Sequence, residues 1–384
     1  MNQKELGELR RRFKPERSAV SRIYGCYVNS QKEVISYLDE SLGLMPQEEA
    51  EKYLSLLKKA LSGAQGRNLI DIVFTTEQVA DSDEHRLLSA LRESELKDGE
   101  VRGALYEKIM GSLDLGEGNY LILLAFDAYD VPYRGRDGEN QADGGDSVFR
   151  YIICAICPVK EGKPELGYFP GENEFHNCTA GQIVSAPEAG FLFPAFDDRA
   201  ANLYNALYYV RKPDELHPEL IDALFRTEAP MSAGEQREAF ASALTESLEE
   251  SCSLEVVQSV HGRLRERIEE HRESRDPEPL AITAGEVAGI LADCGVEEER
   301  VAAFGQACQE RFGGGALDPA NLIDSKKFEV KTGEVTISVD PEYSYLVETR
   351  VIDGRKYILI PAGDGVELNG LAVGLGEPSA EAAE

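Results

Sequence analysis

Apolar runs mark the strands of the first 225 residues. Residues 22–38 hold two short alternating runs around an Asn-Ser pair, which predicts a hairpin, and RNLIDIVFTT at 67–76 predicts a further strand. NYLILLAF at 119–126 and VFRYIICAIC at 148–157 are apolar almost throughout, which is typical of strands buried on both faces. Together with GFLFPAF at 190–196, these runs predict a sheet, mixed or antiparallel, with helices packed on it.

Helical spacing appears between these runs. Residues 46–63 place apolar side chains on one stripe, with a proline near the start and a glycine suited to the C-cap. Shorter helices are expected near residues 84–92 and 101–110. After GFLFPAF, the pair Asp197 and Asp198 precedes apolar residues at 203, 206, 207 and 210. Aspartate is favoured in the first turn of a helix, so this pattern predicts that a helix follows Asp198.

The C-terminal part changes from helix to strand. From Ser232 onward the pattern is helical, and Ser232 with Glu235 and Thr283 with Glu286 both fit a capping box. After residue 321 the period becomes two, and Asp353-Gly354 is a strong signal for a two-residue hairpin turn.

The chain is therefore expected to be an α+β protein in four parts. Residues 1–225 form an α+β domain with a basic N-terminal helix, 226–325 a helical domain, and 326–373 a small β-hairpin unit. Residues 374–384 are expected to be an acidic, disordered tail.

Composition indicates a cytoplasmic protein. The chain has 384 residues with 42% hydrophobic and 29% charged side chains, and neither an apolar run of membrane-spanning length nor a secretory signal is recognised. Seven cysteines, an odd number, favour reduced thiols over a disulfide framework. We expect no membrane association.

Charge is distributed unevenly along the chain. The formal net charge is −30, which repels nucleic acid over most of the surface, but residues 1–22 carry seven basic and three acidic side chains. A basic arm on an acidic body is suited to contact DNA or an acidic partner; the alternative is an ordinary solvated helix. The expected contact residues are Arg10, Arg11, Arg12, Lys14 and Arg17.

Four carboxylates provide a different hypothesis. Asp127 and Asp130 follow the strand at 119–126, and Asp197 and Asp198 follow GFLFPAF. If these strand ends converge, the four aspartates form a site for Mg²⁺ or Mn²⁺ in a metal-dependent hydrolase. The competing interpretation is helix capping by the second pair.

A third hypothesis concerns cysteine. Cys154 and Cys157 form a C-x-x-C pair, with His176 and Cys178 downstream, which is the minimum for a zinc site. However, residues three apart on a strand point to opposite faces, so buried structural cysteines are the competing interpretation. The chain contains no Walker A, G-x-S-x-G, H-E-x-x-H, EF-hand or dinucleotide-binding motif, and no cofactor is expected.

Several strings resemble a known family. RRRFKPE, RIYGCYVN, NYLILLAFDAYDVPYR, ICPVK, GFLFPAFDDR and LVETRVIDGRKYILI are similar to an uncharacterised bacterial family, the domain of unknown function 4317, from about residue 4 to residue 372. The resemblance implies no activity and no catalytic residue. The layout alone is similar to that of bacterial nucleoid-associated proteins, which implies a helix over the segment DDRAANLYNALYYV.

The leading hypothesis is a non-enzymatic binding or scaffold protein whose basic arm contacts phosphate, and the layout similarity extends this to a nucleoid-associated role. The metal-dependent hydrolase is the alternative. A homo-oligomer is compatible with either.

Overall fold

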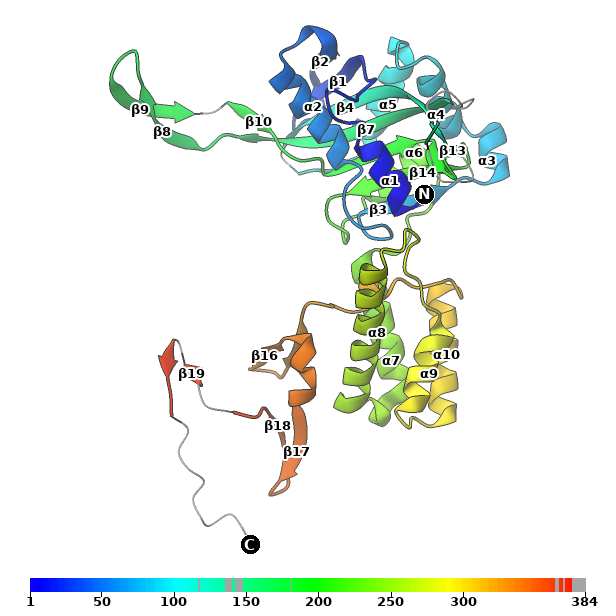
Figure 1. Cartoon of the computed structure of the whole chain (residues 1–384), viewed down its shortest axis with the longest axis vertical. Helices are drawn as coiled ribbons and strands as arrows, with labels where there is room; N and C mark the ends of the chain where they lie inside the picture. The colour runs from blue at the N-terminus through cyan, green and yellow to red at the C-terminus, as the bar shows by residue number, and fades with distance from the viewer. Residues whose placement is uncertain are drawn as a thin grey trace. The chain divides into compact units, whose positions relative to one another are not determined.

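The computed structural model describes residues 1–116, 118–134, 140–141, 148–179, 181–362, 366–368 and 370–374 (Figure 1). It divides into two compact units, which are described separately. Unit 1 comprises Met1–Gln236 with Asp276–Pro279, and unit 2 comprises Arg237–Arg275 with Leu280–Glu384. None of the described helices has the length and apolar content required to span a membrane.

Unit 1 is built on an eight-stranded sheet in which every strand pair is antiparallel. The strand order is β2-β1-β4-β7-β11-β14-β3, with β10 added along β7. The two strongly apolar runs form β4 and β7, which pair over twelve residues at the centre. The strands are β1 (Arg22–Val28), β2 (Val34–Ser41), β3 (Leu69–Val73), β4 (Asn119–Asp130), β7 (Val148–Glu161), β10 (Gln182–Val184), β11 (Ala189–Phe193) and β14 (Asn205–Val210).

Helices cover both faces of this sheet. Successive strand residues point to opposite faces, so β7 places Ile152, Cys154 and Ile156 on one side and Ile153 and Ala155 on the other. The first face packs against α4 (Asp83–Glu93), α5 (Gly99–Ser112) and α6 (Pro218–Phe225). The second packs against α1 (Gln3–Arg10) and α2 (Gln47–Lys59). A further short helix is α3 (Thr76–Asp81).

The helix predicted after Asp198 is wrong. Residues 195–210 instead form β12 (Ala195–Asp197), β13 (Ala200–Asn202) and β14. Asp198 and Arg199 make the two-residue turn between β12 and β13, with φ of 49° and 59°, and positive φ at both positions is the signature of a type I′ hairpin turn. Since β14 is buried on both faces, its apolar residues are continuous, and a continuous run also fits helical spacing.

A two-stranded ribbon extends from the ends of β7 and β10 (Figure 1). It consists of β8 (Pro164–Phe169) and β9 (Glu174–Thr179), and we call it the β-arm. Its register is continuous with the pairing of β7 and β10, because Lys160 faces Ile183 and Tyr168 faces Phe175. Two short strands, β5 (Tyr133–Arg134) and β6 (Asn140–Gln141), form a separate hairpin after β4.

Unit 2 contains the helices predicted from Ser232 onward. They are α7 (Ala233–Leu248, which begins in unit 1), η2 (Glu249–Ser251), α8 (Leu254–Ser274), α9 (Ala284–Asp293), α10 (Glu298–Phe312) and α11 (Pro319–Leu322). Both predicted capping boxes are present, because Ser232 and Glu235 exchange hydrogen bonds, as do Thr283 and Glu286. The core of the unit includes Phe240 and Phe304, whose rings meet edge to face.

Small hairpins follow the helices. They comprise β15 (Phe328–Lys331), β16 (Thr336–Val339), η3 (Pro341–Leu346), β17 (Glu348–Ile352), β18 (Arg355–Leu359), β19 (Glu367–Leu368) and β20 (Leu371–Ala372). The turn between β17 and β18 has positive φ at Asp353 and Gly354, as predicted. The α+β class is thus confirmed, whereas separate helical and β domains within unit 2 remain a prediction. Residues 375–384 of the expected tail lie outside the described residues.

Candidate functional site

The basic N-terminal segment is a docked helix rather than a free arm. Asn2 and Glu5 form a capping box that starts α1. Leu6, Leu9 and Phe13 are almost completely buried in the core beneath the second face of the sheet. Apolar side chains at this spacing anchor the segment, so its charged residues have fixed surroundings.

Two of the expected contact residues are committed to the protein itself. Arg10 Nε donates a hydrogen bond to the carbonyl oxygen of Leu61 at 2.6 Å. Arg12 forms a bidentate pair with Asp127, with Nε 2.6 Å from Oδ2 and Nη2 2.9 Å from Oδ1. Arg11, Lys14 and Arg17 remain exposed.

Asp127 lies inside β4 and is only 1% exposed. Tyr151 on the neighbouring strand donates its hydroxyl hydrogen to Asp127 Oδ2 at 2.7 Å. Burial raises the pKa of Tyr151 well above its usual value, and the adjacent carboxylate adds to this. Burial opposes the charge on Arg12, but its bonds to Asp127 outweigh that effect and raise the pKa of the guanidinium. The three side chains therefore form a satisfied polar network within the core.

The other three aspartates are not gathered around Asp127. Asp197 pairs with the α-amino group of Met1 and accepts a hydrogen bond from Asn202 Nδ2 at 2.8 Å. Asp198 is exposed on its turn, and Asp130 is exposed at the end of β4. Among the described residues, no group of three His, Cys, Asp or Glu side chains is placed to hold a metal ion.

The four residues of the zinc hypothesis also lie apart. Cys154 and Cys157 lie on opposite faces of β7, and each belongs to a different core. Burial raises the pKa of Cys157 to about 12, so its thiol stays protonated at neutral pH. His176 and Cys178 lie on the β-arm, where the His176 ring is tilted against that of Phe169 with centroids 5.6 Å apart, and its Nε2 is 2.9 Å from the Glu172 carboxylate. The structure does not bring the four residues together.

The sequence did not point to Arg199, which the hairpin turn directs toward α1. Its Nη1 donates to Glu8 Oε2 at 2.5 Å, and its Nη2 donates to the carbonyl oxygen of Pro132 at 2.8 Å. Glu8 also accepts a hydrogen bond from the hydroxyl of Tyr129. Burial and this bond raise the pKa of Tyr129 to about 12. No local signal could reveal these contacts, because the partners are more than sixty positions apart.

These residues surround one cavity of about 260 Å³, which we call the arginine cavity. Arg12 and Arg199 are held by Asp127 and Glu8, respectively. Arg11 and Arg17 make no ion pair with any carboxylate of the described chain. The cavity therefore keeps a surplus of positive charge on an otherwise acidic protein. Its lining is Glu8, Arg11, Arg12, Arg17, Tyr129, Pro132 and Arg199.

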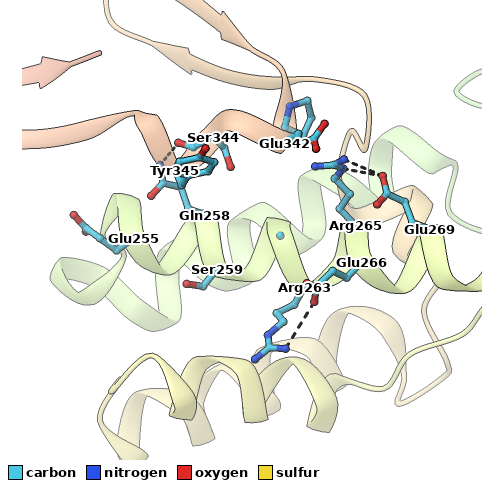
Figure 2. Close-up of a pocket in the computed structure, with 12 residues that line it drawn as sticks. Glu255, Gln258, Ser259, Arg263, Arg265, Glu266, Glu269, Glu342, Ser344 and Tyr345 are labelled. Atoms are coloured by element: carbon cyan, nitrogen blue, oxygen red, sulfur yellow. Dashed lines mark hydrogen bonds and ion pairs between the residues drawn. The ribbon is translucent and has the colours of Figure 1, made fainter. Parts of the chain in front are cut away.

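A larger cavity in unit 2 has the opposite charge balance. It measures about 490 Å³ and lies between α8 and η3, where Gln258 Nε2 donates to the carbonyl oxygen of Ser344 at 2.6 Å (Figure 2). Its two arginines are paired along α8, with Arg263 to Glu266 and Arg265 to Glu269. Because the lining holds four glutamates against these two arginines, this cavity does not favour an anion.

The fold and the arginine cavity define an α+β protein with a three-layer, antiparallel core and a localised cationic site on an acidic body. The chain belongs to the family described as Domain of unknown function (DUF4317), whose model matches residues 1–371. This confirms the resemblance seen in the sequence. No curated protein matches the chain.

Proposed function

We propose that the protein is a non-enzymatic, cytoplasmic binding or scaffold protein that holds a phosphate-bearing partner, specifically the DNA backbone, at the arginine cavity. The observation that supports this proposal is that four arginines line one cavity. Guanidinium is planar and offers paired N–H donors that match the oxygens of a phosphate.

The ion pairs and the exposure of each arginine indicate its role. Arg12 and Arg199 are fixed by carboxylates and shape the wall of the cavity. Arg11 and Arg17 are exposed and retain donors for a ligand. Lys14 is exposed on the same segment and can reach a neighbouring phosphate. Since the rest of the chain is strongly acidic, binding is confined to this patch, and we expect two or three phosphate contacts.

The test is fluorescence anisotropy of labelled duplex DNA with the full chain at low and near-physiological salt. Two or three contacts give a slope of about −2 to −3 in a plot of log K against log salt concentration. Arg11→Glu with Arg17→Glu should abolish binding. Lys4→Glu is the matched control, because Lys4 is exposed on the same segment but does not line the cavity.

Deletion of residues 1–22 is not a suitable variant, because it removes the buried side chains of Leu6, Leu9 and Phe13. Charge reversal leaves that core intact. Absence of binding at low salt, or equal loss in the Lys4→Glu control, would refute the proposal.

A further inference from the structure

The β-arm has one mainly apolar face, on which Asn177 lies opposite Leu166, and one more polar face. Strand register places Leu166, Tyr168 and Phe175 on the same face, and Ile183 at the base of the ribbon continues it. These side chains are between 49% and 74% exposed. The Tyr168 and Phe175 rings contact each other with centroids 5.1 Å apart. Contiguous apolar surface of this kind marks an interaction site.

The opposite face is different in character. It carries His176 and Glu174, and His176 Nε2 lies 3.4 Å from the carboxylate of Glu174. Cys178 and Phe169 share this face. The polar face is therefore suited to water, and the apolar face is suited to a partner. Among the described elements, only the two strands themselves pair within the β-arm, and an isolated two-stranded ribbon is marginally stable.

We propose that the apolar face of the β-arm packs against the same face of a second copy of this chain, with the two arms antiparallel about a twofold axis. Such an interface is formed by the same residues of both copies, so every contact between two different residues occurs twice, once on each side of the axis. The twofold axis lies near Pro164, midway between Tyr168 and Lys160 along this face, so the aromatic pair at each tip lies over the base of the partner's ribbon, near Ile183.

Net charge selects this arrangement over direct contact of the two bodies. Each copy carries a formal charge of −30, so body-to-body docking is opposed by repulsion. The ribbon extends about eight residues beyond β10, or roughly 25 Å at the rise of a strand. Paired arms therefore separate the acidic bodies by more than the Debye length of about 8 Å at physiological salt. The apolar strip can associate while the bodies remain screened from each other, and Lys160, opposite Ile183 at its base, adds a positive charge rather than a further negative one.

The available area is adequate for a dimer. At about 200 Å² per large side chain, the exposed parts of the four residues contribute roughly 500 Å² per copy. The flanking backbone and polar side chains extend this toward the ~800 Å² per partner of a standard interface.

The test is sedimentation equilibrium of the full chain at micromolar concentration, where the wild type should be dimeric. Phe175→Ser should raise the dissociation constant roughly 30-fold, because the substitution removes an aromatic contact at both ends of the symmetric interface. Val73→Ser is the matched control, because Val73 is also an exposed apolar strand residue, on β3, and should leave the dimer unchanged. A monomeric wild type, or equal weakening by both substitutions, would overturn the proposal.

Cross-linking identifies the face. In a Cys178→Ser background, Pro164→Cys, which lies next to the twofold axis, should give a disulfide-linked dimer on mild oxidation, whereas Phe169→Cys on the polar face should not. Both positions are exposed on β8, so neither substitution disturbs a buried core. Equal cross-linking at the two positions would refute packing through the apolar face.

Discussion

Removing Arg12 should destabilise unit 1 strongly. Arg12→Ala leaves Asp127 as a carboxylate that is 1% exposed, with Tyr151 as its remaining side-chain partner. Removing one member of a buried ion pair typically costs 3–5 kcal/mol, because the other charge remains desolvated and uncompensated. Loss of the Arg12 contact over the Tyr129 ring, where the guanidinium carbon lies 4.4 Å from the centroid, adds a smaller amount.

In a unit of this size, 1 kcal/mol corresponds to about 2–4 °C, so the melting temperature of unit 1 should fall by about 10 °C. Differential scanning calorimetry of the full chain provides the measurement. Unit 2 is the internal control, because its transition should not move.

A second variant separates charge burial from simple loss of packing. Arg12→Met with Asp127→Asn removes both charges while the amide oxygen still accepts the hydrogen bond from Tyr151. This double variant should recover much of the lost stability, because an uncharged pair has no desolvated charge to compensate. If Arg12→Ala lowers stability by less than about 1 kcal/mol, Asp127 is reached by water and the inferred core network is wrong.

Two further predictions concern stability. Gly190→Ala should lower the free energy of unfolding of unit 1 by about 1–3 kcal/mol or more, because an added Cβ would lie 2.4 Å from the carbonyl oxygen of Cys154. Gly103→Ala should raise it by about 0.5–1 kcal/mol, because Gly103 lies in the middle of α5 with open space around the added Cβ; chemical denaturation of both variants provides the comparison. His261 Nε2 donates to the carbonyl oxygen of Asp324 at 3.0 Å, and burial lowers the pKa of the His261 ring. The neutral ring therefore stabilises unit 2 at pH values above the unfolded-state pKa of about 6.5, and this contribution is lost as the pH falls through the lower folded-state pKa. Unit 2 should therefore melt at a lower temperature at pH 5 than at pH 7.5, and His261→Gln should flatten that dependence; an unchanged slope would contradict the assignment.

Most of the fold was predictable from local pattern, because alternation and helical spacing follow directly from which face of an element is buried. β4 and β7 were identified in this way, as was the turn at Asp353-Gly354, where the residue types match the required φ angles. β14 was misjudged for a physical reason. A strand covered on both faces loses its alternation, so Leu207 and Tyr209 on one face and Tyr208 on the other read as a continuous apolar run.

The site was predictable only in part. The concentration of positive charge near residues 10–17 is visible in the sequence. The sequence does not reveal which arginines are available to a ligand. Arg12 is paired with Asp127, 115 positions away, and Arg199 reaches the cavity because it lies in the turn of the β12–β13 hairpin, where a helix was predicted. Long-range pairing of this kind depends on the completed sheet rather than on any local preference.

The position of β3 at the edge of the sheet has a consequence for synthesis on the ribosome. β3 is third among the sheet strands in chain order after β1 and β2, yet its partner is β14, and the paired residues Val73 and Asn205 are 132 positions apart. At about 5–20 residues per second, the nascent β3 waits on the order of 10 s for its partner to be translated. Its apolar residues and unpaired backbone groups form an open edge during that interval, when it is most prone to join a neighbouring chain. Chaperone binding during translation is therefore of most use between the emergence of Leu69 and that of Val210.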